Sequence, residues 1–152
     1  MSELRDLYQE VILDHSKRPR NFRDMADCTH EADGHNRLCG DKLHVCLKIA
    51  NGKILDAAFK GSGCAISTAS ASMMTDAVKG KTLQEAHELF NLFHQALTSS
   101  PTEEAPHLEE LGKLSAFSGV REFPVRIKCA TLAWHTMEVA VDKQHGQTTT
   151  EE

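Results

Sequence analysis

The chain has 152 residues, 40% of them hydrophobic and 26% charged, which is enough for one domain with a substantial core. Its formal net charge of −5 argues against nucleic acid as the main partner. No apolar run approaches the roughly 20 residues that span a bilayer, and the chain opens on a polar stretch without the features of a signal peptide. We therefore expect a cytoplasmic protein with no membrane partner.

A helix and a polar connection are expected first. Apolar residues recur at helical spacing over residues 3–15, which predicts an amphipathic helix. Pro19 follows and prevents the helix from continuing. His15 stands at the helix end, where the dipole favours a cation, and we interpret it in that role.

Strands are expected next. Residues 27–35 are interpreted as a short edge strand. Residues 43–49 alternate between apolar and polar side chains, which is typical of a half-buried strand. The Asn51-Gly52 pair is a strong hairpin signal because both turn positions require positive φ. With residues 53–60 as the return strand, the pattern predicts an antiparallel hairpin that leads into a glycine-rich loop.

Helices account for most of the remaining chain. Small and apolar residues predict a helix over residues 64–79. Thr82 and Glu85 form a capping-box pattern that opens the next helix. Residues 107–117 are expected to form a short helix. Pro124 begins the last one, because a missing N–H is tolerated at the first helical position.

The order of these elements indicates the fold class. Strands come grouped and helices come grouped, which predicts an α+β fold. We expect a two-layer single domain over residues 1–145, in which a small antiparallel sheet of about three strands packs against several helices. Residues 146–152 are expected to form a disordered polar tail.

Three cysteines and an aspartate stand where the loops of this fold are expected to meet. Cys39 and Asp41 precede the first hairpin strand, and side chains two residues apart in extended chain point the same way. Cys64 follows the second hairpin strand, at a helix N-terminus that favours a thiolate. A hairpin brings its outer ends together, and Cys129 near the start of the last helix can be aimed at the same place.

Supporting residues surround this group. They are three glycines that allow sharp turns and close approach to a bound ion, and two basic residues that can offset thiolate charge: Gly40, Gly61, Gly63, Arg126 and Lys128. The other two cysteines, Cys28 and Cys46, are interpreted as small apolar residues.

Three thiolates and a carboxylate form a tetrahedral donor set suited to Zn²⁺. The same residues would also bind iron or a [2Fe–2S] cluster, whose usual ligands are cysteine thiolates. A third possibility is a zinc ion that only stabilises the fold. Asp41 is a hard ligand among soft sulfurs and the most readily displaced, which favours a centre that opens over a closed structural site.

Three motifs resemble the signature blocks of the IscU/NifU-N family of iron–sulfur cluster assembly proteins. The motifs are Leu38-Cys39-Gly40-Asp41, residues 61–70 and residues 128–134. The opening of the chain is similar too, so the resemblance extends from residue 5 to about residue 142. Lys128 stands where scaffold members carry a histidine, and residues 98–117 lengthen the stretch before the third cysteine. Both features resemble the SufU branch.

The resemblance to the SufU branch implies a zinc ion bound by Cys39, Asp41, Cys64 and Cys129. It also implies a sulfurtransferase role, in which Cys39 accepts persulfide sulfur from the cysteine desulfurase SufS for relay to the SufBCD complex. The IscU branch implies the alternative, a scaffold on which a transient [2Fe–2S] cluster is assembled and passed on. The missing histidine favours the first role.

Overall fold

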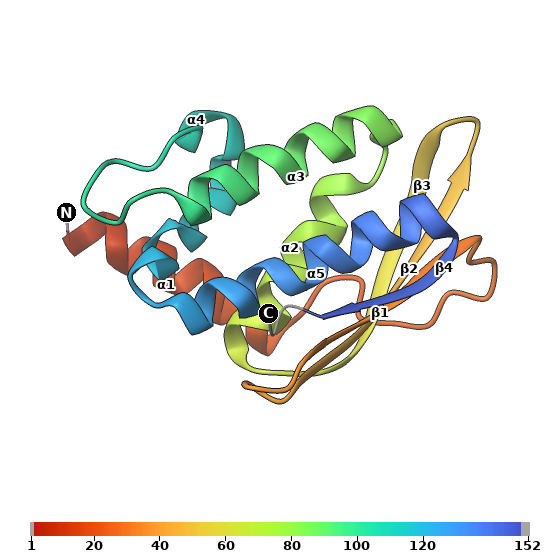
Figure 1. The fold of residues 1–152 in the computed structure, drawn as a ribbon, viewed down its shortest axis with the longest axis horizontal. Helices are drawn as coiled ribbons and strands as arrows, with labels where there is room; N and C mark the ends of the chain where they lie inside the picture. The colour runs from red at the N-terminus through yellow and green to blue at the C-terminus, as the bar shows by residue number, and fades with distance from the viewer. Residues whose placement is uncertain (1, 150–152) are drawn as a thin grey trace.

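A four-stranded sheet packs with one face against a layer of helices in the computed structural model, which describes residues 2–149 (Figure 1). The strand order is β3-β2-β1-β4. The strands are β1 His30–Asn36, β2 Asp41–Ala50, β3 Lys53–Ser62 and β4 His145–Thr149. The helices are α1 Ser2–Lys17, α2 Ala65–Val78, α3 Leu83–Thr98, α4 Leu108–Leu111, α5 Pro124–Lys143 and the 3-10 helix η1 Gly112–Glu122. The predicted α+β fold of two layers is confirmed.

The β2–β3 hairpin brings the two halves of the predicted site together. Asn51 and Gly52 have φ of 53° and 74°, so both turn positions are left-handed as predicted. The two strands pair antiparallel from Ala50 opposite Lys53 to Lys42 opposite Ser62. The residues just outside that last pair therefore emerge at one end of the sheet.

Residues 146–149 differ from their prediction as part of a disordered tail over residues 146–152, and the last three residues of that tail lie outside the described part of the chain. The chain turns at Gln144 with φ of 64°, and residues 145–149 form β4, which pairs in parallel with β1. Backbone pairing does not need apolar side chains, so this polar sequence carries little sign of a strand. The sheet is consequently mixed, and β1 is an interior strand over His30–Asn36 instead of an edge strand over residues 27–35.

Two smaller predictions are wrong. His15 is predicted to act as a cation at the end of the first helix, but its side chain is buried, with Nδ1 2.7 Å from Ser72 Oγ. Burial lowers the pKa of its imidazole and so disfavours the cation. The helix predicted over residues 107–117 is divided into α4 and η1, because Gly112 adopts a φ of 57° at the end of α4.

Helix α5 lies between the sheet and α3 and carries the centre of the core (Figure 1). Its Trp134 is fully buried and stacks on Phe93 of α3 with ring centroids 4.6 Å apart. The indole Nε1 donates a hydrogen bond to Ser70 Oγ of α2 at 3.1 Å. This packing fixes the rotation of α5 and turns Cys129, on the same helix, toward the interior.

Strand β1 approaches α5 closely at one glycine. A Cβ at Gly34 would collide with Thr136 Oγ1 of α5 and would lie 3.1 Å from Leu132 Cδ1. No other residue type leaves room for this contact. Gly34 therefore sets the spacing between the sheet and the helix that carries Cys129.

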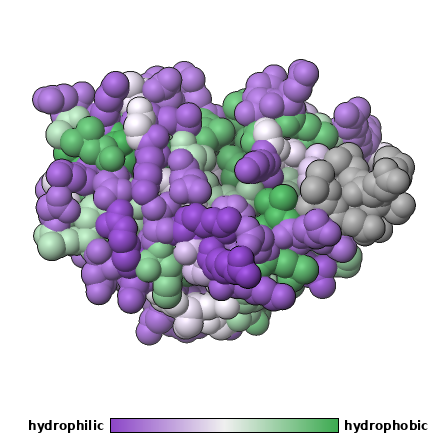
Figure 2. Space-filling view, turned by 180° about the vertical axis from the view of Figure 1, so that it is seen from behind, coloured by the Kyte–Doolittle hydropathy of each residue, from purple (hydrophilic) through white to green (hydrophobic). Residues whose placement is uncertain are grey.

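One face of the molecule is mainly polar (Figure 2). Figure 2 shows the rear face, where apolar side chains form separate patches among polar ones. Within residues 2–149, no helix is both long enough and apolar enough to cross a membrane.

We predict that Gly34→Ala lowers the free energy of unfolding by about 1–3 kcal/mol, because the added methyl overpacks the β1–α5 contact. Urea unfolding measures this change. Gly119→Ala is the matched control, because a Cβ at Gly119 meets nothing within 4 Å. In a Thr136→Ala background Gly34→Ala should cost less. Equal costs for Gly34→Ala and Gly119→Ala would contradict the packing role.

Candidate metal centre

Cys39, Asp41 and Cys129 meet at the end of the sheet where β2 begins. One ligand atom of each residue lies within 4.8 Å of those of the other two. The Cys39 and Cys129 sulfurs are 2.8 Å apart in a thiol hydrogen bond. Asp41 and Cys129 are buried, whereas Cys39 is half-buried on the turn before β2. Residues 90 positions apart in the sequence thus form one donor group.

Cys64 joins this group through Asp41. It is the N-cap residue of α2, and its backbone N–H donates a hydrogen bond to Asp41 Oδ1 at 2.8 Å. Its Sγ atom lies 3.9 Å from Asp41 Oδ2 and accepts a hydrogen bond from the Ser67 N–H at 3.4 Å. All four residues predicted as ligands therefore lie at the same end of the sheet.

Burial disfavours the thiolate form of two residues of this group, Cys64 and Cys129. Burial raises the pKa of Cys64, an effect that the Ser67 N–H opposes and the Asp41 charge reinforces. Burial and hydrogen bonding with Cys39 raise the pKa of Cys129 well above its usual range. The prediction that a helix N-terminus makes Cys64 partly ionised is therefore wrong, because burial outweighs the dipole. A bound cation would reverse this balance, since metal binding displaces thiol protons.

The donor set fits a thiolate-preferring metal. Two sulfurs bound to one tetrahedral zinc lie about 3.8 Å apart, given Zn–S distances of about 2.3 Å. The Cys64 sulfur and the Asp41 carboxylate already have a comparable separation of 3.9 Å. The Cys39 and Cys129 sulfurs, at 2.8 Å, must move apart by about 1 Å to share an ion. Cys39 is the member that can move, because it lies on a turn and is only half-buried.

The three supporting glycines have different roles. Gly40 has φ of 70° and open space around it, so its role is conformational. Gly61 has φ of 127°, and a side chain there would collide with the Lys42 carbonyl. A Cβ at Gly63 would lie 2.7 Å from Asp41 Oδ1, so Gly63 leaves space for the carboxylate.

A surface cavity of about 580 Å³ gives access to the thiols of Cys39, Cys64 and Cys129. Its walls are largely apolar and include Phe123, whose ring lies 4.4 Å from the Arg126 guanidinium carbon. Arg126 therefore lies where its positive charge faces the cavity. Lys128 is half-buried on α5 and does not belong to the described lining.

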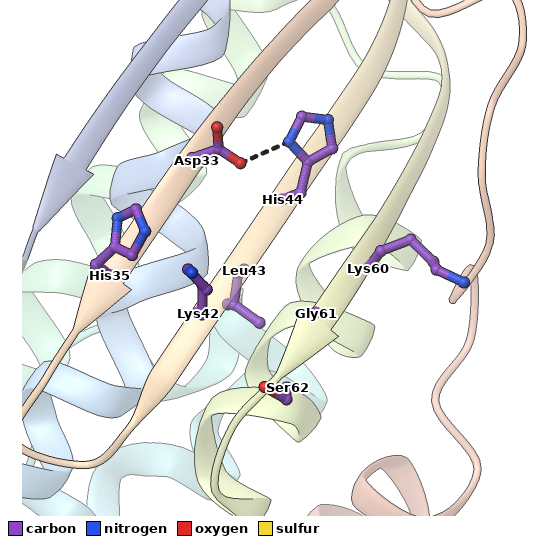
Figure 3. A pocket seen from close by; sticks show the side chains of 8 residues that line it. All are labelled: Asp33, His35, Lys42, Leu43, His44, Lys60, Gly61 and Ser62. Carbon is purple, nitrogen blue, oxygen red and sulfur yellow. Dashed lines mark hydrogen bonds and ion pairs between the residues drawn. The ribbon is translucent and has the colours of Figure 1, made fainter.

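A second cavity, of about 400 Å³, lies on the outer face of the sheet (Figure 3). Asp33 and His44 point toward each other there, with Asp33 Oδ1 2.8 Å from His44 Nδ1. Lys42 lines this cavity on the face opposite to Asp41, because successive strand residues point to opposite faces. The sheet therefore separates this cavity from the candidate metal centre.

Cys28 and Cys46 lie outside the candidate metal centre and contact each other. Burial and a hydrogen bond with Cys28 raise the pKa of Cys46 to about 12. Both side chains are half-buried.

Asn36 is a residue of the centre that no sequence prediction included. Its side chain is fully buried, and Nδ2 donates a hydrogen bond to Cys129 Sγ at 3.6 Å. It pairs with Asp41 across β1 and β2. The predicted strand over residues 27–35 does not include Asn36. Had the strand been placed over residues 30–36, a polar residue on its buried face would have indicated a special role for Asn36.

Alkylation of the metal-free protein should show the raised thiol pKa values. We expect the rate at Cys64 and Cys129 to keep rising with pH above about 9, where an ordinary cysteine with a pKa of about 8.5 is already mostly thiolate. Peptide mapping after iodoacetamide treatment from pH 7 to pH 10 measures the rates, and urea-unfolded protein is the control. A plateau at the same pH in folded and unfolded protein would contradict this assignment.

Gly63→Ala should weaken zinc binding by about tenfold, because the new methyl group displaces the Asp41 carboxylate. Competition with a coloured chelator measures the affinity. Gly119→Ala, where the added Cβ meets nothing within 4 Å, should bind zinc like the unchanged protein. Unaltered affinity in Gly63→Ala would argue against Asp41 as a ligand.

This chain is similar to known proteins over nearly its whole length. The family model described as the NifU-like N-terminal domain matches residues 7–151. The iron–sulfur cluster assembly scaffold protein IscU of Streptococcus pyogenes is 43% identical over 143 residues, which cover 94% of this chain and 87% of that protein. The zinc-dependent sulfurtransferase SufU of Bacillus subtilis is 40% identical over 145 residues, covering 95% and 96%.

A solved structure has the same fold. It is a protein of Fervidobacterium islandicum that is described as a candidate iron–sulfur cluster assembly scaffold for the SUF system, with a TM-score of 0.80 and 33% identity. The match covers 88% of this chain and 95% of that one.

Proposed function

Because the chain belongs to the NifU-like N-terminal domain family, whose relatives take part in iron–sulfur cluster assembly, we propose that it is a zinc-dependent sulfurtransferase of the SufU type. The observation that carries this proposal is a pair of half-buried thiols, Cys39 and Cys64, beside the buried thiol of Cys129 and a buried carboxylate at an accessible cavity. The near full-length similarity to the Bacillus subtilis sulfurtransferase supports it.

Cys39, Asp41, Cys64 and Cys129 would hold the zinc ion. Bound zinc would keep thiolates ionised without oxidising them, because the ion has no redox chemistry. Arg126 at the cavity adds positive charge near the sulfurs. Lys128 stands two residues further along α5, at the position where the scaffold branch carries a histidine.

Cys39 is the proposed sulfur acceptor. Its thiolate attacks the terminal sulfur of a persulfide on a cysteine desulfurase of the SufS type, and the desulfurase cysteine leaves as a thiolate. One sulfur–sulfur bond breaks and one forms, so the exchange needs no oxidant or reductant. The half-buried position of Cys39 allows it to reach a partner, whereas Cys129 is too deeply buried. The SufBCD complex is the proposed downstream acceptor.

A scaffold role is the second candidate. The Streptococcus pyogenes relative named IscU is as similar to this chain as the Bacillus subtilis SufU. In that role the same three cysteines and Asp41 would bind a transient [2Fe–2S] cluster as cargo, since thiolates are its usual ligands.

Purification without added iron, followed by metal analysis and a desulfurase assay, distinguishes these roles. We expect about one zinc per chain, as for a single four-ligand site, together with faster alanine release by the desulfurase. Cys39→Ser should abolish the acceleration, whereas the control Cys28→Ser should retain it. A coloured cluster that transfers to apo-ferredoxin without any need for zinc would reject the sulfurtransferase in favour of the scaffold.

A further inference from the structure

Two buried oxygen atoms have no hydrogen-bond partner in the part of the chain that the structure describes. They are Asn36 Oδ1 and Ser67 Oγ. Both side chains are fully buried, one on β1 and the other on α2. Both also lie against the candidate metal centre, so the two exceptions occur at the same place in the fold.

Asn36 contacts the centre from the sheet. Its amide Nδ2 donates to Cys129 Sγ at 3.6 Å, and its backbone pairs with that of Asp41. An N–H donor stabilises a thiolate more than a neutral thiol, because bonds to ionised acceptors are stronger. The amide therefore favours the form of Cys129 that binds metal.

Ser67 contacts the centre from the first turn of α2. Its backbone N–H donates to Cys64 Sγ at 3.4 Å. Its hydroxyl borders the same space at Gly63 as the Asp41 carboxylate, since a Cβ there would be 3.2 Å from Ser67 Oγ and 2.7 Å from Asp41 Oδ1. Rotation of the Ser67 side chain toward this shared space would direct its hydroxyl to that carboxylate.

A contribution to fold stability does not explain why these two buried positions carry polar side chains. A buried polar atom without a partner is costly, and an apolar residue of similar size avoids this cost. Ser70 provides a contrast one turn further along α2. It is equally buried, but its hydroxyl donates to the Ala130 carbonyl and accepts from the Trp134 indole.

We propose that Asn36 and Ser67 are positioning residues of the metal centre, whose buried amide and hydroxyl donate hydrogen bonds to Cys129 and Asp41 when these bind the ion. This inference rests on the proposed function for the identity of the centre. In this role the two residues orient the metal ligands and compensate their charge, as hydrogen-bond donors around a metal site do. Their poor contribution to folding is then the consequence of a role in metal binding.

Binding of Zn²⁺ and Co²⁺ to the full chain tests this proposal. Asn36→Leu and Ser67→Ala should each weaken zinc affinity by about tenfold in chelator competition. The thermal midpoint of the metal-free variants should stay unchanged or rise, because a buried unpartnered oxygen is removed. Thr75→Ala is the matched control, because Thr75 is also fully buried on α2 but its hydroxyl donates to the Ser72 carbonyl; it should show the reverse, with lower stability and unchanged affinity.

The spectrum of the Co²⁺-loaded protein gives a readout that a structural role would not move. Loss of the N–H donor raises the energy of the sulfur electrons, so Asn36→Leu should shift the thiolate-to-cobalt charge-transfer band to longer wavelength. Ser67→Ala should lower affinity without that shift, because its hydroxyl faces the carboxylate.

The possible results separate the two proposals. Variants that match the unchanged protein in affinity and spectrum would reject the positioning role, whatever the sulfur-transfer assay shows. Affinity losses that only follow losses of stability, as in a folding defect, would also reject it. If the unchanged protein binds metal but accepts no sulfur, the sulfurtransferase proposal alone fails. If the unchanged protein binds neither Zn²⁺ nor Co²⁺, both proposals fail.

Discussion

The hydrogen bond from the Cys64 N–H to Asp41 Oδ1 is the contact on which the arrangement of this molecule depends. It closes the outer ends of the β2–β3 hairpin and joins the end of the sheet to the N-terminus of α2. Asp41 is buried, and a buried carboxylate is tolerated only where donors surround it. The backbone of Cys64 supplies a donor, and Gly63 supplies the space for the carboxylate. The contact thus fixes two of the candidate ligands relative to each other.

Burial and charge oppose each other at this centre. The closely packed core around Trp134 holds Cys129 in a position where burial favours a neutral thiol. A metal ion requires the thiolate instead. Burial therefore makes metal affinity depend on pH, because protons compete for the same sulfur atoms. Two groups can reduce this competition by favouring the thiolate. The Asn36 amide donates a hydrogen bond to Cys129 Sγ, and the Arg126 guanidinium adds positive charge at the cavity.

Local patterns predicted the hairpin, the capping box of α3 and the convergence of four residues from three segments. Each depends on short-range chemistry: positive φ at Asn51 and Gly52, and reciprocal bonding between Thr82 and Glu85. Predictions failed where packing between distant segments decides the outcome. β4 is a polar strand stabilised by pairing with β1, and the state of Cys64 depends on burial that spacing alone does not show. Asn36 was missed for the same reason, because its burial follows from the register of an interior strand.

The distance in sequence between the thiols has a consequence for synthesis of the chain. Cys39 and Cys129, whose sulfur atoms touch in the folded protein, are 90 positions apart. At roughly 5–20 residues per second on the ribosome, Cys39 and Cys64 emerge several seconds before α5 exists. During that interval the hairpin can form its turn, but two thiols lack the helix that buries and completes their group. The growing chain is therefore most exposed to adventitious metals and oxidants just before its last helix packs onto the sheet.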